Sequence, residues 1–357
     1  MRFRVSLLTV LAIVGGCLLI PSCSEANRGD QERLADLISG IENAGTPKRE
    51  QGIKDVRTFL KSSDPQVRCD AARMLYEMKD RSGYDTLIEV LRSPDPVLGN
   101  GGLDLRHFAA RTFARYRERR AGEALLGLYA KTRSHEVGPA ASTLRLKGMV
   151  PYLHESLRER LWYTSVADLA VLESQNNQPL FKKLADNEEA TPKQRAAAIF
   201  GLAMSGDEAS LERLIAVATN GKEALPGNHD DLFIAEWHAA TYLTNFRGER
   251  VVKVFEDMLT WKDKSVSPSI ALAYLRYRYP QNKPSREIIK AGLQARESSL
   301  GWDYTFLLQL ARLSGDPELI ALGKQTDETT FLMDVHAGWS NAWIEHMLPD
   351  WEGDWPD

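Results

Sequence analysis

Cysteine is scarce in this chain of 357 residues, which has only three, at positions 17, 23 and 69. If the N-terminal segment is removed, the mature chain keeps only Cys23 and Cys69. Two cysteines cannot form the framework of several disulfide bonds that holds small secreted domains together. Cys69 stands beside an apolar helical stripe. We therefore expect it to be a small packing residue rather than a reactive thiol.

Short catalytic and metal-binding motifs are also missing. The sequence has no G-x-S-x-G, no Walker A and no C-x-x-C, and none of its seven histidines pairs with another at the i, i+4 spacing of a helical zinc site. His229, Asp230 and Asp231 end the stretch 221–231, which we interpret as a solvated loop rather than a metal site. We expect no metal, cofactor or catalytic residue, and no small-molecule substrate is indicated. An active site assembled from distant residues stays open.

A strong net charge is absent as well. The formal net charge is -4 at pH 7, which would repel nucleic acid unless a local basic patch overrode it, so we expect no nucleic-acid partner. The densest basic run comprises Arg106, Arg111, Arg115, Arg117, Arg119 and Arg120. We interpret these arginines as a solvated helix face that pairs in part with acids such as Glu118. The alternative is a grip on an acidic peptide or a phosphate headgroup.

The sequence does contain one long apolar run, at its N-terminus. Arg2 and Arg4 precede apolar residues 5–20, and a short polar segment ending in Cys23 follows, which is the order typical of a secretory signal. The run is short for a membrane span. We expect residues 1–22 to be removed as a signal peptide.

The four residues Ile20-Pro21-Ser22-Cys23 resemble a bacterial lipobox, although Pro21 departs from the usual small residue. The resemblance implies lipid attachment at Cys23 and a short tether over residues 23–30. Ser24 is not the aspartate that retains many lipoproteins in the inner membrane. The resemblance therefore implies an exported protein on the periplasmic face of the outer membrane, anchored in the membrane through its N-terminal lipid.

Alternatives to lipidation at Cys23 remain. Val14-Gly15-Gly16-Cys17 is a second candidate box, and ordinary cleavage after Ala26 would give a soluble periplasmic or secreted protein. An uncut anchor is the third alternative.

The stretch Asp64–Ser93 carries the clearest structural pattern. Asp64 is an N-cap candidate, and Pro65 suits the first position of a helix, where no N–H is needed. Apolar residues then recur at helical spacing, stop at Ser82-Gly83 and resume from Leu87. This pattern predicts a helix, a tight turn and a second helix.

The run D-P-x-V-R-x-x-A-A-x-x-L, from Asp64 to Leu75, resembles the HEAT repeat in the short bacterial form also seen in bilin lyases. Similar runs begin near positions 105, 191 and 235, and no alternation of apolar and polar residues demands a strand. Since one such unit cannot bury its apolar face alone, the resemblance implies an all-α fold, an α-solenoid of HEAT-like helical hairpins over residues 31–348.

Some positions depart from the regular unit or recur within it. Residues 152–172 are expected to be helical, and 99–102 and 221–231 are expected to be loop insertions. The repeat position shared by Arg68, Arg106 and Arg195 favours a structural role between repeats.

The last residues, 349–357, form an acidic tail that contains tryptophan. Just before it, Trp339, Trp343, His346 and Met347 share a helical face, and we favour an amphipathic helix there that closes the end of the solenoid. The alternative is that the tail is a docking segment for a basic partner, because it has too few apolar partners to fold alone. The candidate partner-binding residues are Asp350, Trp351, Asp354 and Trp355.

Three functional hypotheses follow from these features. The main one is a non-catalytic, lipid-anchored interaction scaffold of the bacterial cell envelope that binds a protein or peptide on the solenoid surface. The alternatives are an enzyme or enzyme-accessory protein of HEAT-like lyase type, and a structural assembly factor of an envelope complex. Export argues against bilin attachment itself.

Overall fold

The computed structural model describes residues 29–34, 37, 46–134, 137–159, 162–225, 232–261, 267–295 and 304–326. Within these ranges the chain is helical, and the β-type pairing is confined to an isolated antiparallel bridge between Leu98 and Asp104. The predicted all-α solenoid is confirmed. Among the described helices, none has both the length and the apolar character that crossing a membrane requires.

Contacts divide the chain into two compact units, with the boundary between Gly83 and Tyr84. One continuous array over residues 31–348 stays a prediction. The helices of the first unit are α3 (Thr46–Thr58), η2 (Phe59–Lys61), α4 (Pro65–Glu77) and η3 (Arg81–Gly83).

The first unit contains the repeat identified from sequence, and α4 begins where the sequence predicts. The carboxylate of Asp64 accepts a hydrogen bond of 2.8 Å from the Gln66 amide and caps the helix ahead of Pro65. Val67 and Leu75 are fully buried in the core of this unit. Burial raises the pKa of the Cys69 thiol to about 12, so the prediction that it is a packing residue is confirmed.

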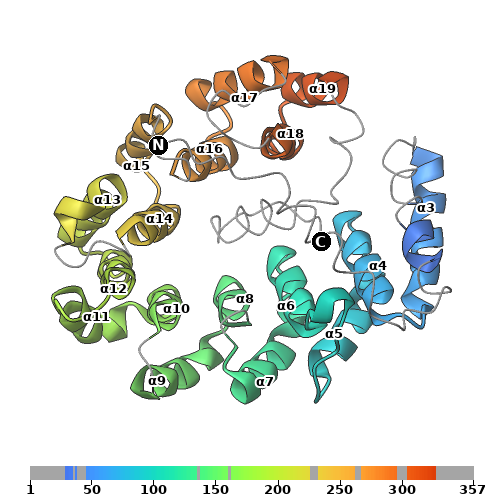
Figure 1. Ribbon diagram of the computed structural model, residues 1–357, viewed down its shortest axis with the longest axis horizontal. Coiled ribbons are helices and arrows are strands. Elements are labelled where there is room, and N and C mark those ends of the chain that lie inside the picture. The colour runs from blue at the N-terminus through green and yellow to red at the C-terminus, as the bar shows by residue number, and fades with distance from the viewer. Residues whose placement is uncertain are drawn as a thin grey trace, which may run out of the picture. The chain divides into compact units, whose positions relative to one another are not determined.

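The second unit holds the remaining described helices (Figure 1). Up to the middle of the chain they are α5 (Tyr84–Arg92), α6 (Leu105–Arg115), α7 (Gly122–Thr132), α8 (Val137–Thr143), α9 (Val150–Glu159), α10 (Tyr163–Glu173), α11 (Gln178–Ala185) and α12 (Pro192–Met204). They continue with α13 (Glu208–Ala224), α14 (Leu232–Leu243), α15 (Glu249–Met258), α16 (Ser267–Arg278), α17 (Lys283–Ala295), α18 (Tyr304–Leu313) and α19 (Pro317–Thr326).

Alternate helices of the second unit form one layer. In this layer, each helix packs against the next in the order α6, α8, α10, α12, α14, α16 and α18. The odd-numbered helices between them, such as α11, α13 and α15, pack against members of this layer. Each helix thus contacts neighbours one or two places along the chain. This is the packing that a stack of helical hairpins requires.

Helix α12 shows why the second unit packs closely. It starts with a capping box in which Thr191 accepts from the Gln194 amide and Gln194 accepts from the Thr191 amide. A Cβ atom placed at Gly201 would lie 2.6 Å from the ring of Phe181, so only glycine lets α11 approach there. Small side chains in α12 therefore bring its neighbours within direct packing distance.

Some sequence expectations need correction. Residues 152–172 are not one helix, because Trp162 has an extended backbone and α10 begins after it. The predicted loop 221–231 starts late, since Gly221–Ala224 lies within α13, where the Gly221 amide donates to Glu236 Oε1 at 3.0 Å. By contrast, the predicted loop at 99–102 is confirmed as a short turn between α5 and α6, with Gly101 and Gly102 at positive φ.

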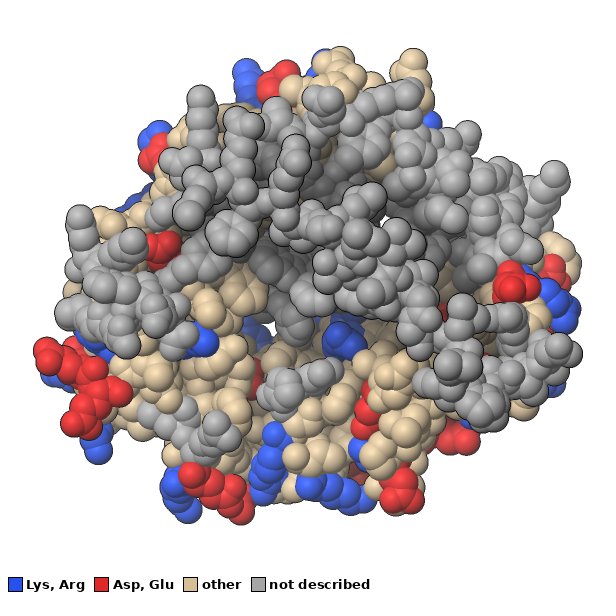
Figure 2. Space-filling view, viewed as in Figure 1, with Lys and Arg blue, Asp and Glu red and all other residues tan. Residues whose placement is uncertain are grey.

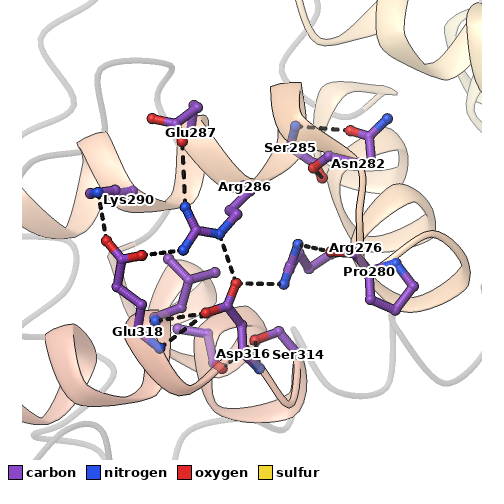
Figure 3. A network of polar contacts seen from close by, with 12 residues as sticks. Arg276, Pro280, Asn282, Ser285, Arg286, Glu287, Lys290, Ser314, Asp316 and Glu318 are labelled. Carbon is purple, nitrogen blue, oxygen red and sulfur yellow. Dashed lines mark hydrogen bonds and ion pairs between the residues drawn. The ribbon is translucent and has the colours of Figure 1, made fainter.

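A polar network joins the last described helices (Figure 3). Asp316 precedes α19, and its Oδ1 accepts from the Glu318 amide at 3.0 Å. Its Oδ2 accepts from Arg276 Nη2 of α16 at 3.1 Å and from Arg286 Nε of α17 at 2.8 Å. One carboxylate therefore caps a helix and holds arginines from two others.

Candidate ligand-binding pocket

The second unit contains a cavity of about 310 Å³ between helices α8, α10, α12 and α14 and the residues that follow α14. This volume lies at the lower end of the range for small-molecule sites. The cavity combines apolar and aromatic walls with a few polar side chains. It is lined by Pro139, Ser142, Thr143, Tyr163, Thr164, Ala167, Asp168, Val171, Phe200, Trp237, His238, Thr241, Tyr242 and Asn245.

Asp168 is the charged residue of the pocket, and α10 places it against α8. A Cβ at Gly138 would lie 2.8 Å from Asp168 Oδ2, so the glycine makes room for the carboxyl group. Ser142, one turn further along α8, donates a hydrogen bond of 2.6 Å to Asp168 Oδ1. The carboxyl group is therefore held in one place by α8.

The carboxyl group of Asp168 is buried without a cation. The residue is 8% exposed, and among the described residues no lysine or arginine pairs with it. Burial raises the pKa of Asp168 to about 7, although the hydrogen bond from Ser142 acts to lower it. At neutral pH this group is therefore a mixture of protonated and ionised forms.

Aromatic rings form the opposite side of the pocket. Phe200 and Tyr242 stack with their centroids 4.6 Å apart and an interplanar angle of 8°. The ring of His238 lies 4.7 Å from Tyr163 and 4.6 Å from Trp237. Rings from α10, α12 and α14 therefore pack together along this part of the pocket. Offset and tilted aromatic pairs of this kind add to the stability of the site.

The buried polar atoms of the pocket that lack a hydrogen-bond partner among the described residues include His238 Nε2 and Asn245 Oδ1. The amide nitrogen of Asn245 is used, because it donates to the Tyr242 carbonyl at 3.1 Å. Burial, followed by the charge of Lys193, lowers the pKa of His238 to about 4, so its ring is neutral at pH 7. Buried polar atoms left this way cost about 1–3 kcal/mol each, and a bound group that satisfied them would recover part of that energy.

The site residues proposed from sequence fall outside the part of the chain that the structure describes. Cys23 and the tail residues Asp350, Trp351, Asp354 and Trp355 are outside the residues that the structure describes, so their roles stay predictions. His229, Asp230 and Asp231 also lie outside, as does the amphipathic helix expected over 339–347. No group of three or more potential metal ligands was found in the described part of the chain.

The predicted solvated helix face is correct only in part for the basic run, because Arg106 is buried, whereas Arg119 and Arg120 are exposed and lie after α6 ends. Arg106 is 7% exposed, and its Nη2 donates to Asp104 Oδ2 at 2.7 Å. Arg120 pairs with Glu118 at 2.7 Å, as expected. On the face seen in Figure 2, basic and acidic side chains are interspersed.

The arginines at the shared repeat position bond to nearby groups. Arg68 Nη1 donates to the Ser62 carbonyl at 2.7 Å, and Arg195 Nε lies 3.4 Å from the Ala185 carbonyl at the end of α11. Together with the Arg106–Asp104 pair, these bonds confirm a structural role for that position. Arg68 and Arg106 bond to residues just before their own helices, and Arg195 reaches the preceding helix, so a role between repeats stays a prediction for Arg68 and Arg106.

Sequence reasoning missed the pocket. Its residues come from separate helices whose packing no local pattern reveals. A signal was present in the stretch V-A-D-L-A-V-L, residues 166–172, where Asp168 is the only charged residue among apolar neighbours. A carboxyl group in such a stretch is expensive to bury unless it is paired or has a function.

Comparisons with known proteins agree with the repeat interpretation. Residues 194–220 match the family model described as PBS lyase HEAT-like repeat. Among solved structures, the chain is similar to one from the complex of CpcE and CpcF of phycocyanin lyase from Nostoc sp. PCC7120. The two share 18% sequence identity with a TM-score of 0.46, and the match covers 67% of this chain and 92% of that chain. No match was found among curated proteins.

Proposed function

We propose that this protein acts by binding, and that the pocket between α8, α10, α12 and α14 is its recognition site. The observation that carries this proposal is the set of buried polar groups in one cavity. Asp168 has no cation, and His238 Nε2 and Asn245 Oδ1 have no hydrogen-bond partner among the described residues. Groups of this kind destabilise a fold when left alone, and they are typical of sites that are completed by a bound group.

The accessory form of this proposal has the better support. The family match over residues 194–220 is to a repeat named for a lyase, and it includes Phe200 of the pocket wall. We therefore propose an accessory protein that holds a partner or ligand for an enzyme of HEAT-like lyase type. A general interaction scaffold and an assembly factor of an envelope complex are the other forms of the same binding role.

The cellular setting that we propose rests on the sequence. The resemblance of residues 20–23 to a lipobox supports lipid attachment at Cys23 and tethering to the periplasmic face of the outer membrane. In the native host, Cys23→Ala should move the protein from the membrane fraction to the soluble fraction, as measured by immunoblotting. Unchanged membrane association of this variant would overturn the tether.

The binding role is tested with a variant that fills the pocket. Ala167 lines the cavity and is half-buried, so Ala167→Phe should occupy the space without removing a polar group. We expect wild-type protein to capture a partner from host extracts in near-stoichiometric amount and Ala167→Phe to lose at least nine-tenths of it, as quantified by mass spectrometry. Circular dichroism verifies that the variant is folded.

The matched control is Glu189→Gln, at an exposed position of the same unit. It should capture the partner as the wild type does. Equal capture by Ala167→Phe would show that recognition occurs elsewhere. Turnover of a small molecule by the isolated protein would instead establish an enzyme.

A further inference from the structure

The chemistry of the pocket specifies the kind of group that fits it, and this inference rests on the proposed binding role. Asp168 presents carboxylate oxygens, and Asn245 presents an amide oxygen without a partner among the described residues, while its NH₂ group donates one hydrogen bond to the Tyr242 carbonyl. We propose that the pocket binds an organic cation that carries N–H donors, such as a protonated amine or an amidinium group, with Asp168 as its counter-ion.

Besides groups that can donate, such as the indole N–H of Trp237 and the hydroxyls of Tyr163 and Thr164, the pocket presents a set of acceptors. An ionised carboxylate and an amide oxygen both accept, whereas Ser142 Oγ already donates to Asp168. His238 Nε2 is the adaptable group, because a neutral ring presents either a donor or an acceptor according to its tautomer. A ligand rich in N–H groups satisfies this set.

The aromatic wall suits a positive charge as well. Tyrosine and tryptophan rings attract cations that lie over their faces within about 6 Å of the centroid. The protein already uses one of these rings in this way, because Lys193 Nζ lies 5.8 Å from the centroid of Tyr163. Tyr242 and Trp237 line the same cavity as Asp168. A cation in the cavity would thus meet a carboxylate and aromatic rings together.

The titratable side chains nearest to Asp168 are neutral and do not pair with its carboxylate. Tyr129 of α7 and Tyr242 of α14 both have a raised pKa, with burial as the main cause and the charge of Asp168 contributing, so both are neutral at pH 7. His238 is also neutral. Lys193 lies over the ring of Tyr163. An anion would be repelled by ionised Asp168, and the positive charge of Lys193 lies at the ring of Tyr163 instead of at this carboxyl group.

The same arrangement sets the pH dependence of binding. A cation pairs with ionised Asp168, so its affinity should rise with pH until the carboxyl group is fully ionised. With a pKa of about 7 for the free pocket, only about one tenth of the molecules are ionised at pH 6. The affinity at pH 6 should be about tenfold lower than at pH 8.5, and binding near pH 7 should release protons.

Isothermal titration of the full chain with benzamidinium tests this inference. We expect saturable binding with one site, tenfold tighter at pH 8.5 than at pH 6, and no binding of benzoate, which has a similar shape and the opposite charge. Asp168→Asn should weaken benzamidinium binding at pH 8.5 at least tenfold and abolish the pH dependence. Glu189→Gln is the folded control with a surface carboxylate removed, and it should bind as the wild type does.

The inference is overturned if benzoate binds as well as benzamidinium, if neither binds, or if Asp168→Asn binds benzamidinium unchanged. Its failure is distinguishable from failure of the binding role. Capture of a partner that Ala167→Phe loses, without benzamidinium binding, would remove the cation and keep the recognition site. Benzamidinium binding without such capture would keep the cation site and remove the proposed recognition of a partner.

Discussion

Asp168→Asn should be more stable than the wild type at pH 8, by up to about 4 kcal/mol. The wild-type carboxyl group is mostly ionised there although it is buried and has no cation among the described residues. Its pKa is raised from 3.8 to about 7, and each unit of such a shift corresponds to about 1.4 kcal/mol. Asparagine has nearly the same shape, and its amide oxygen can accept the hydrogen bond from Ser142.

The stabilisation should vanish in acid. Because the pKa of Asp168 is higher in the folded protein than in the unfolded chain, the folded state binds more protons between about pH 4 and pH 7. The contribution of this group is therefore most favourable below pH 4, and it is lost as the pH rises through about 7. Asp168→Asn lacks this dependence, so the two proteins should have similar stability near pH 4.

Urea unfolding followed by circular dichroism at pH 4, 6 and 8 measures this difference. The control Glu189→Gln should show no comparable gain at pH 8, because its position is exposed. A variant that is no more stable than wild type at pH 8, or equally more stable at every pH, would contradict the burial of an unpaired carboxylate. A residue that lowers stability in this way is typical of a functional site.

Asp316→Ala should destabilise the end of the second unit by about 3–5 kcal/mol. Asp316 holds Arg276, which is 1% exposed, together with Arg286, as Figure 3 shows. Removing the carboxylate leaves a buried guanidinium without its partner and takes away the cap of α19 at the same time. Both losses act on helices that pack against one another.

Hydrogen exchange measures this effect where it arises. In a repeat array, stability is largely a sum of local terms, so amides of α16, α17 and α19 should exchange about 10²–10³ times faster in Asp316→Ala. The matched control is Glu318→Gln, which alters exposed pairs with Arg286 and Lys290 and should cost at most about 1 kcal/mol. Similar exchange in the two variants would show that the buried pairing does not stabilise these helices.

The sequence predicts those parts of the fold that local chemistry decides. Asp64-Pro65 and Thr191-Pro192 mark the starts of α4 and α12, because a capping oxygen followed by proline specifies a helix N-terminus. It also predicts Cys69 and Arg106 as structural residues, since small or paired side chains at a repeated position suit helix packing.

The pocket depends on packing that local patterns do not contain. Asp168 and His238 are far apart in the chain, and they share a cavity because α10 and α14 both pack on α12. Glu236 is a second case in which the local sequence does not predict the contact. It replaces the arginine of the repeat, and only the structure shows that it accepts from the amide of Gly221.

Photo-crosslinking from the pocket in the native host tests the central claim most directly. A benzophenone amino acid replacing Thr164, which lines the cavity, should form a covalent product with one partner or ligand, as identified by mass spectrometry. The same group at Lys182, an exposed position of α11, should form none of that product. The product from Thr164 should also disappear when Ala167→Phe fills the cavity. Products that form equally from both positions, or that survive Ala167→Phe, would contradict recognition at this site.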